Sequence, residues 1–201
     1  LLNGFGGAAS ALVAVISVLS GGVLDTFSLA TAGLALMVGM VTLTGSLVAA
    51  GKLHKVLGQH PVVWPAHQRI TSLALLASVV TIVLIVVQPL PPLFFIILCA
   101  VVSGFFGVAF AIRVGGADMP ITISLLNSLS GVAGAIAGMA ISDPLLVAIG
   151  GVVGASGLLL TQIMCRAMNR HLADILMGRT SVASGHKAAA PEPAAVRKLD
   201  P

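Results

Sequence analysis

Six long apolar stretches fill most of this chain and leave little room for any other kind of fold. About 20 helical residues cross the hydrocarbon core of a membrane. Six stretches come close to that length: residues 3–20, 27–50, 70–87, 93–112, 120–141 and 145–167. Charged residues make up only 8% of the chain, against about 25% in soluble domains. The sequence therefore predicts an all-α membrane protein, a bundle of six transmembrane helices, and excludes an ordinary soluble domain.

The basic residues predict how this bundle is oriented. The connections at 20–25, 88–92 and 142–144 contain no Lys or Arg. All ten basic residues fall in the other connections or near the C-terminus: Lys52, Lys55, Arg69, Arg113, Arg166, Arg170, Arg179, Lys187, Arg197 and Lys198. Because cytoplasmic loops are enriched in Lys and Arg, we expect both ends of the bundle inside, an N-in/C-in topology.

The fifth stretch carries an unusual polar face. On a helix, steps of three and four residues bring small and polar side chains together: Pro120, Ser124, Asn127, Ser128, Gly131, Ala135, Gly138 and Ser142. An amide in hydrocarbon needs a partner. Two interpretations stay open at this point: Asn127 forms an interhelical hydrogen bond that holds the bundle together, or it belongs to a hydrated path that relays protons.

Other small or reactive residues have simpler interpretations. Thr31, Thr42 and Ser46 share one face of the second stretch and can bond to their own helix carbonyls or line a wet path. The glycines of the sixth stretch (Gly150, Gly154 and Gly157) lie in an apolar helix, so they predict close helix packing rather than a nucleotide loop. Cys99 and Cys165 suggest neither a disulfide nor a metal site. The five histidines lie in loops or the tail, and we expect them to be solvated.

The two ends of the chain predict further sequence beyond them. The start, LLNGFGG, has neither a Met nor a basic leader. After Arg179 the composition changes to Ala, Pro and charged residues without apolar periodicity. Such composition is typical of a linker. We expect residues 171–201 to be a flexible cytoplasmic linker to a domain that this sequence does not contain.

Several motifs resemble one membrane-protein family. They are LLNGFGGAAS at 1–10, TLTGSLVAAGKL at 42–53, GGADMP at 115–120, LLNSLSG at 125–131 and IMCRAMNR at 163–170. Together they resemble the β-subunit membrane domain (domain II) of proton-translocating NAD(P) transhydrogenase. The resemblance implies that residues 1–170 form a transmembrane proton-channel domain. It also implies that NADP(H) and NAD(H) bind elsewhere in the complete enzyme, with no cofactor or metal held by this chain.

The resemblance assigns roles to residues in two groups. Asn127 matches the family's intramembrane asparagine and Ser46 a serine on the facing helix, and their neighbours extend this proton path to Asn3, Thr42, Ser124 and Ser128. Asp118 matches an acid that couples the channel to the NADP(H) domain. We group it with Arg113, Arg166 and Arg170, the last at the junction with the linker. Gly131, Gly138, Gly150, Gly154 and Gly157 are assigned to helix packing, and we expect Gly131 and Gly138 to leave room for the fifth helix to shift.

Two departures from the family bear on the mechanism. Several members have a histidine where this chain has Asn3, and an acid where it has Thr31. The resemblance therefore implies that a helix of the companion α-subunit supplies the missing histidine. The other implied partners are the NADP(H)-binding domain of the same subunit and a second copy in a dimer of αβ units. The resemblance also implies that the protein lies in a bacterial inner (cytoplasmic) membrane and has no nucleic-acid partner. A small solute transporter and a structural helix-bundle scaffold stay open as alternatives.

Overall fold

The structure is a computed structural model that describes residues 1–20, 25–87, 91–172 and 175. Its helices are α1 (Leu2–Leu19), α2 (Thr26–Leu53), α3 (His67–Val87), α4 (Pro92–Ile112), α5 (Met119–Ala140) and α6 (Pro144–Ala167), with a short 3₁₀ turn, η1 (Gly116–Asp118), before α5. All six α-helices are long and apolar enough to cross a membrane. The prediction of an all-α, multi-pass membrane protein is confirmed.

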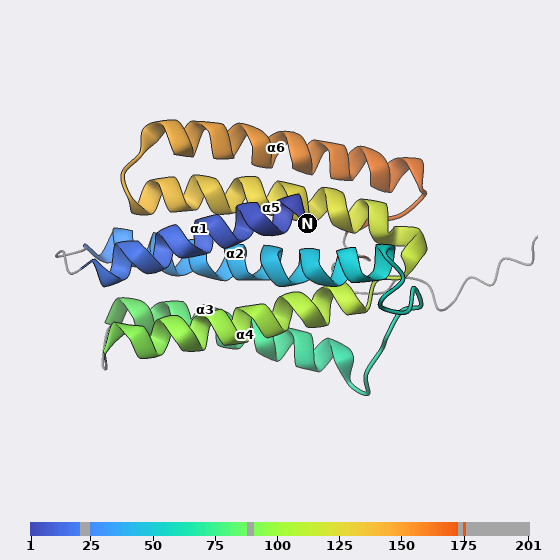
Figure 1. Ribbon diagram of the computed structural model, residues 1–201, viewed down its shortest axis with the longest axis horizontal. Helices are drawn as coiled ribbons and strands as arrows, with labels where there is room; N and C mark the ends of the chain where they lie inside the picture. Colours follow the sequence, from blue (N-terminus) through green and yellow to red (C-terminus); the bar gives the residue numbers. More distant parts are fainter. Residues whose placement is uncertain (21–24, 88–90, 173–174, 176–201) are drawn as a thin grey trace, which may run out of the picture.

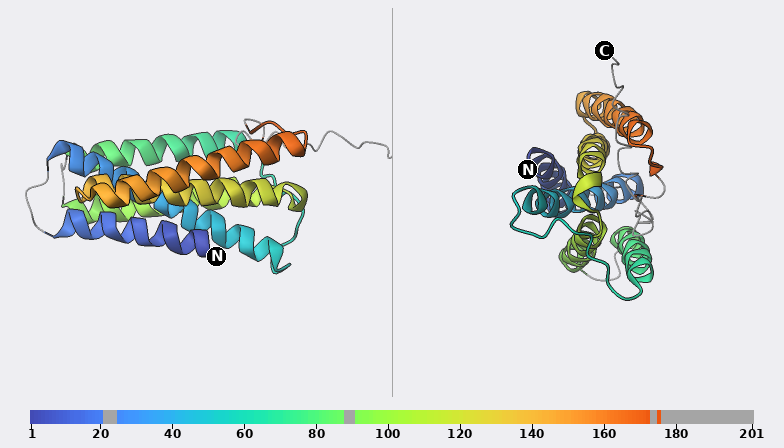
Figure 2. Two further views of the ribbon diagram at one scale, coloured as in Figure 1. Left: turned by 90° about the horizontal axis from the view of Figure 1, so that it is seen from above. Right: turned by 90° about the vertical axis from the view of Figure 1, so that its right-hand side faces the viewer.

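The helices stack in layers around α2 and α5. From top to bottom in Figure 1 lie α6, then α5, then α1 with α2, and finally α3 with α4. The end view in Figure 2 shows α6 and α3 on the outside of the bundle. Burial follows this order: 61% of the membrane window of α2 and 56% of that of α5 are buried, against 22% for α6. The side chains of α2 and α5 therefore form most of the interior.

Helix starts are fixed by short polar residues and prolines. Asp25 caps α2, with its carboxylate accepting the Ser28 backbone N–H at 3.1 Å. Hydrogen bonds from the Ser28 side chain and backbone lower the pKa of the Asp25 carboxyl. Asp143 caps α6 in the same way, accepting from the first-turn N–H groups of Leu145 and Leu146. Pro144 follows that cap at the first helical position, where its missing N–H costs nothing.

The C-terminal end of α4 is held by two buried side chains from neighbouring helices. Lys52 of α2 is 1% exposed, and its ammonium donates to the carbonyl oxygens of Ile112 and Val114. His67 of α3 contacts the Ala109 carbonyl oxygen through Nε2 at 2.8 Å, while its Nδ1 accepts the Trp64 backbone N–H. These contacts satisfy carbonyl groups that a helix end leaves open. The expectation that the histidines are solvated is wrong for His67, which is 3% exposed.

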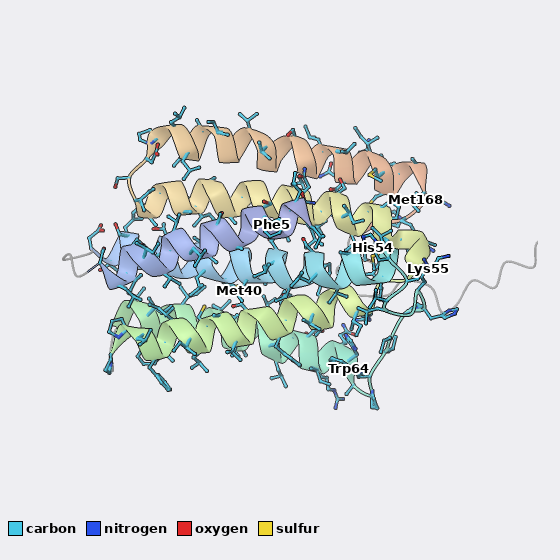
Figure 3. All side chains as sticks on the ribbon, in the orientation of Figure 1. Phe5, Met40, His54, Lys55, Trp64 and Met168 are labelled. Atoms are coloured by element: carbon cyan, nitrogen blue, oxygen red, sulfur yellow. The ribbon has the colours of Figure 1, made fainter. Side chains whose placement is uncertain are left out.

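One end of the bundle collects the polar loops. The ends of α2, α4 and α6 meet there with the starts of α3 and α5, on the right in Figure 1. His54, Lys55, Trp64 and Met168 all lie at this end in Figure 3. At the opposite end lie the ends of α1, α3 and α5 and the starts of α2, α4 and α6. We call the end that collects the polar loops the basic end.

Candidate functional site

The flank of α5 that faces α6 uses its polar groups in hydrogen bonds. Ser128 donates its hydroxyl to the Gly154 carbonyl oxygen at 2.6 Å. The Thr161 hydroxyl of α6 lies 2.9 Å from the Ser124 hydroxyl and 2.8 Å from the Gly157 carbonyl oxygen. Ser124 and Ser128, assigned to a proton path from the sequence, are thus placed between two packed helices. Both are buried.

Glycines bring the backbones of α5 and α6 into direct contact along this flank. A Cβ atom added to Gly131 would lie 2.5 Å from the Gly154 backbone nitrogen, and one added to Gly150 would lie 2.3 Å from that of Ala135. At Gly138 the nearest atom is the Val147 backbone nitrogen, at 2.8 Å. Such approach is possible only without side chains. The room that Gly131 and Gly138 were expected to leave for movement is therefore filled by α6. We call this contact the α5–α6 seam.

The flank of α5 that faces α1 and α2 is built differently. Asn3 of α1 donates its side-chain amide to the Ile123 carbonyl oxygen at 3.3 Å. Further along, a Cβ added to Gly6 would meet the Ser130 hydroxyl oxygen at 2.3 Å. A Cβ added to Gly4 would lie 3.1 Å from the Cβ of Ser46 on α2. Glycines of α1 thus allow this helix to pack closely against both α5 and α2.

A cavity of about 230 Å³ opens where these three helices meet. It is lined by Leu1, Asn3, Ser46, Ala49, Ala50, Leu53, His54, Ile123 and Leu126. The Ser46 hydroxyl is buried and has no hydrogen-bond partner within the described part of the chain. α1 begins beside the cavity, part-way along the bundle. We call it the Asn3–Ser46 cavity.

Of the residues assigned to the path, only two line this cavity. Thr42 is buried one turn before Ser46, but its hydroxyl donates to the Val38 carbonyl oxygen at 2.7 Å. His54, one of the histidines expected to be solvated, lies at the exposed rim of the cavity. Ser46, Ala50 and His54 follow one another at intervals of four residues, so they share one face of α2. This spacing could have predicted that His54 lies beside the cavity.

Asn127 occupies a position between the two flanks. It follows Ile123, on the α1 side, by four residues, and Ser124, on the α6 side, by three, so it lies between them on the helix surface. It is half-buried, it does not line the cavity, and its amide forms no hydrogen bond within the described residues. The structure thus leaves this amide open on the surface between α1 and α6.

At the basic end, the start of α5 meets the end of α6. Arg170 Nε lies 3.2 Å from Asp118 Oδ1, an ion-pair contact without hydrogen-bond geometry. Asp118 is 5% exposed. The loop before α3 joins this corner, since the Gly116 N–H donates to the Gln59 carbonyl oxygen at 2.9 Å. Arg113 lines other hollows, and Arg166 lies exposed on the last turn of α6.

Fold and site together define a multi-pass membrane protein with a small cavity between three helices, into which Asn3 and Ser46 bring polar groups, and an ion pair at one end. Its family follows from comparison with known proteins. The family model described as NAD(P) transhydrogenase beta subunit matches residues 1–200, and the chain belongs to this family. Two relatives from Rhodospirillum rubrum, each named NAD(P) transhydrogenase subunit beta, are 35% identical over 160 residues. The matched region covers 79% of this chain but only 34% of each relative, so the chain spans about a third of their length.

Proposed function

We propose that this chain is the proton-translocating membrane domain of a NAD(P) transhydrogenase. In the complete enzyme, hydride transfer between NAD(H) and NADP(H) would be coupled to proton movement through this bundle. The nucleotides would bind in domains outside this sequence.

The observation that carries the proposal is the partnerless hydroxyl of Ser46 beside Asn3 in the cavity. A buried polar group that lacks a protein partner is satisfied by water when the site is polar and has room. The Asn3–Ser46 cavity has room for several water molecules. Asn3 and Ser46 would orient these waters as fixed donors and acceptors, and the waters would carry the proton.

The proton also needs a group that changes charge. Asn3, Ser46 and Asn127 remain neutral, so they cannot supply it. We propose that a helix of the α-subunit supplies a histidine and packs over the open surface between α1 and α6. The half-buried amide of Asn127 would then receive a hydrogen-bond partner from that helix.

The basic end would couple this path to the nucleotide-binding domain. Asp118 directly precedes α5, without a side-chain capping hydrogen bond, and Arg170 follows the end of α6, so their ion-pair contact joins the two helices of the seam. A soluble domain that displaced Arg170 would change the charge beside the start of α5. With the basic end in the cytoplasm, the topology is N-in/C-in in a bacterial inner membrane, and the enzyme works as a dimer of αβ units.

The test is to replace Asn127 by Leu in the full enzyme and to measure proton pumping and hydride transfer in reconstituted vesicles. Loss of coupled pumping in a folded protein supports the proposal, and unchanged pumping contradicts it. The Asn3–Ser46 cavity is a poor solute site, because its volume of about 230 Å³ lies below the usual 300–1,000 Å³ of ligand pockets. A scaffold role predicts that Asn127→Leu changes stability alone.

A further inference from the structure

A buried lysine joins three segments at the basic end. Lys52, on the last turn of α2, is 1% exposed. Its ammonium donates to the carbonyl oxygens of Ile112 and Val114, at the end of α4, and to that of His60, in the loop before α3, at 3.4 Å. An ammonium has three N–H donors, so these three carbonyl groups use all of them. The proposed proton path gives this residue no role.

The positive charge of Lys52 strengthens these contacts. Among the described residues no carboxylate forms an ion pair with this ammonium, so the carbonyl dipoles are what stabilises its buried charge. Hydrogen bonds from a charged donor are roughly twice as strong as those between neutral groups. A buried charge that lost its hydrogen-bond acceptors would be strongly destabilising. The ammonium therefore holds all three carbonyl groups close to the end of α2.

The loops that Lys52 holds also bind each other. The Val62 N–H donates to the Ile112 carbonyl oxygen at 3.2 Å, and the Gly116 N–H donates to the Gln59 carbonyl oxygen at 2.9 Å. Gly116 is closely packed as well, since a Cβ added there would lie 3.3 Å from the Cβ of Gln59. We call these two segments the loop pair: residues 59–62 and 112–118. Lys52 fixes the loop pair to α2.

The loop pair lies between the two parts of the molecule that the proposed function uses. At one end it finishes with Asp118, which contacts Arg170 beyond α6. At the other end, Lys52 is followed directly by Leu53, which lines the Asn3–Ser46 cavity. Ser46 lies six residues before Lys52 on the same helix, about 9 Å along its axis. A displacement of Asp118 would therefore reach the wall of the cavity through a continuous set of hydrogen bonds.

We propose that Lys52 is a positioning residue that links the contact between Asp118 and Arg170 to the Asn3–Ser46 cavity. This inference rests on the proposed function, because it concerns how a change at Asp118 reaches the proton path. Coupling between distant sites needs a physically connected element that both sites bias. The loop pair is that element, and Lys52 is its attachment to α2. Without the ammonium, Asp118 and the cavity would move independently of each other.

The first test measures proton pumping and hydride transfer by the full-length enzyme in reconstituted vesicles. Lys52→Met keeps the length of the side chain and removes its three donors. We expect pumping to fall about tenfold, a size typical of couplings between sites, while hydride transfer continues. Lys52→Arg restores a cation with several donors and recovers part of the pumping. Lys55→Met, at an exposed lysine in the same loop, is the matched control and changes neither rate.

Hydrogen exchange separates positioning from general damage. In Lys52→Met we expect the N–H groups of Val62 and Gly116, which bond the two loops together, to exchange at least about tenfold faster. The α5–α6 seam should keep its protection, and the melting temperature should change little. Unchanged exchange in the loop pair would overturn the inference. Faster exchange throughout the bundle would also overturn it, because Lys52 would then only stabilise the fold.

A cavity variant distinguishes failure of this inference from failure of the proposed function. Ala50 lines the cavity, and Ala50→Leu fills it. If Ala50→Leu stops pumping while Lys52→Met pumps normally, the path stands and the role of Lys52 is refuted. If Ala50→Leu pumps normally, the path is refuted and this inference with it. Should Lys52→Met not fold, Gly116→Val pushes the loop pair away from Gln59 and should lower pumping in the same way. Normal pumping in Gly116→Val would then overturn the inference.

Discussion

The two flanks of α5 use similar residues for different purposes. On the flank facing α6, serines and glycines are fully engaged: Ser128 bonds to a backbone carbonyl, and Gly131 lies against Gly154. On the flank facing α1 and α2, Asn3 makes one long hydrogen bond and Ser46 makes none within the described residues. A small polar residue in a membrane helix therefore indicates function only where its hydrogen-bonding capacity remains open.

The largest expected effect comes from filling the seam. Gly150→Leu would drive a side chain into the α5 backbone, since even a Cβ at this position lies 2.3 Å from the Ala135 nitrogen. We expect a loss of about 3 kcal/mol in unfolding free energy, seen as a lower melting temperature and a poor yield in detergent. Gly151→Leu is the control. Gly151 has nothing within 4 Å of its Cβ position, so equal damage from both would contradict the seam.

Filling the cavity should act on function instead. Ala50 lines the Asn3–Ser46 cavity, and Ala50→Leu places hydrocarbon where we expect water. We predict at least about a tenfold fall in proton pumping, equivalent to about 1.4 kcal/mol in barrier height, with little change in the melting temperature. Pumping in reconstituted vesicles is the measurement. Normal pumping in a stably folded Ala50→Leu protein would show that the cavity carries no protons.

Two serine replacements sharpen the same contrast at a smaller scale. Ser128→Ala removes the hydrogen bond to Gly154 and should cost about 1 kcal/mol of stability, with pumping retained. Ser46→Ala removes a hydroxyl that lacks a protein partner, so stability should hold while pumping falls. Thermal unfolding measures stability and vesicle assays measure proton pumping, and both are made on each variant. The opposite pairing would reverse the roles assigned to the two flanks.

The smallest effect is expected at the end of the seam. Asp118 and Arg170 join the same two helices through charge rather than through close packing. Because Arg170 is 31% exposed, solvent weakens the pair, and a double-mutant cycle should give a coupling of less than about 1 kcal/mol. Added salt should reduce this coupling further. A much larger, salt-insensitive coupling would mean that charge, and not glycine packing, unites α5 and α6.

The sequence predicted the helices well because their signal is local. Apolar length placed all six spans. The largest differences were three residues, at the end of α2, which reaches Leu53 rather than residue 50, and at the start of α3, which begins at His67 rather than near residue 70. That helix starts early because His67 is buried against α4. A loop histidine with a helix carbonyl as its partner cannot be recognised without knowing which helices are neighbours.

For the same reason, the sequence could not predict how the polar residues of α5 divide between its two flanks. A helical projection groups Ser124, Asn127 and Ser128 on one side. It does not show that α6 covers Ser124 and Ser128 while Asn127 faces the gap beside α1. Likewise, an unsatisfied hydroxyl at Ser46 and a satisfied one at Thr42 look identical in sequence, since only the fold decides which of them finds a carbonyl.

Water access to the two flanks tests the central claim most directly. Single cysteines would replace Ser46 or Ser128 in the full-length protein, after Cys99 and Cys165 have been changed to Ala. Each variant is then exposed to a small, water-soluble thiol reagent in intact membranes, and labelling is measured by mass spectrometry. The account predicts that Ser46→Cys is labelled and that Ser128→Cys is not. Labelling of Ser128→Cys alone, or equal labelling of the two, would contradict it.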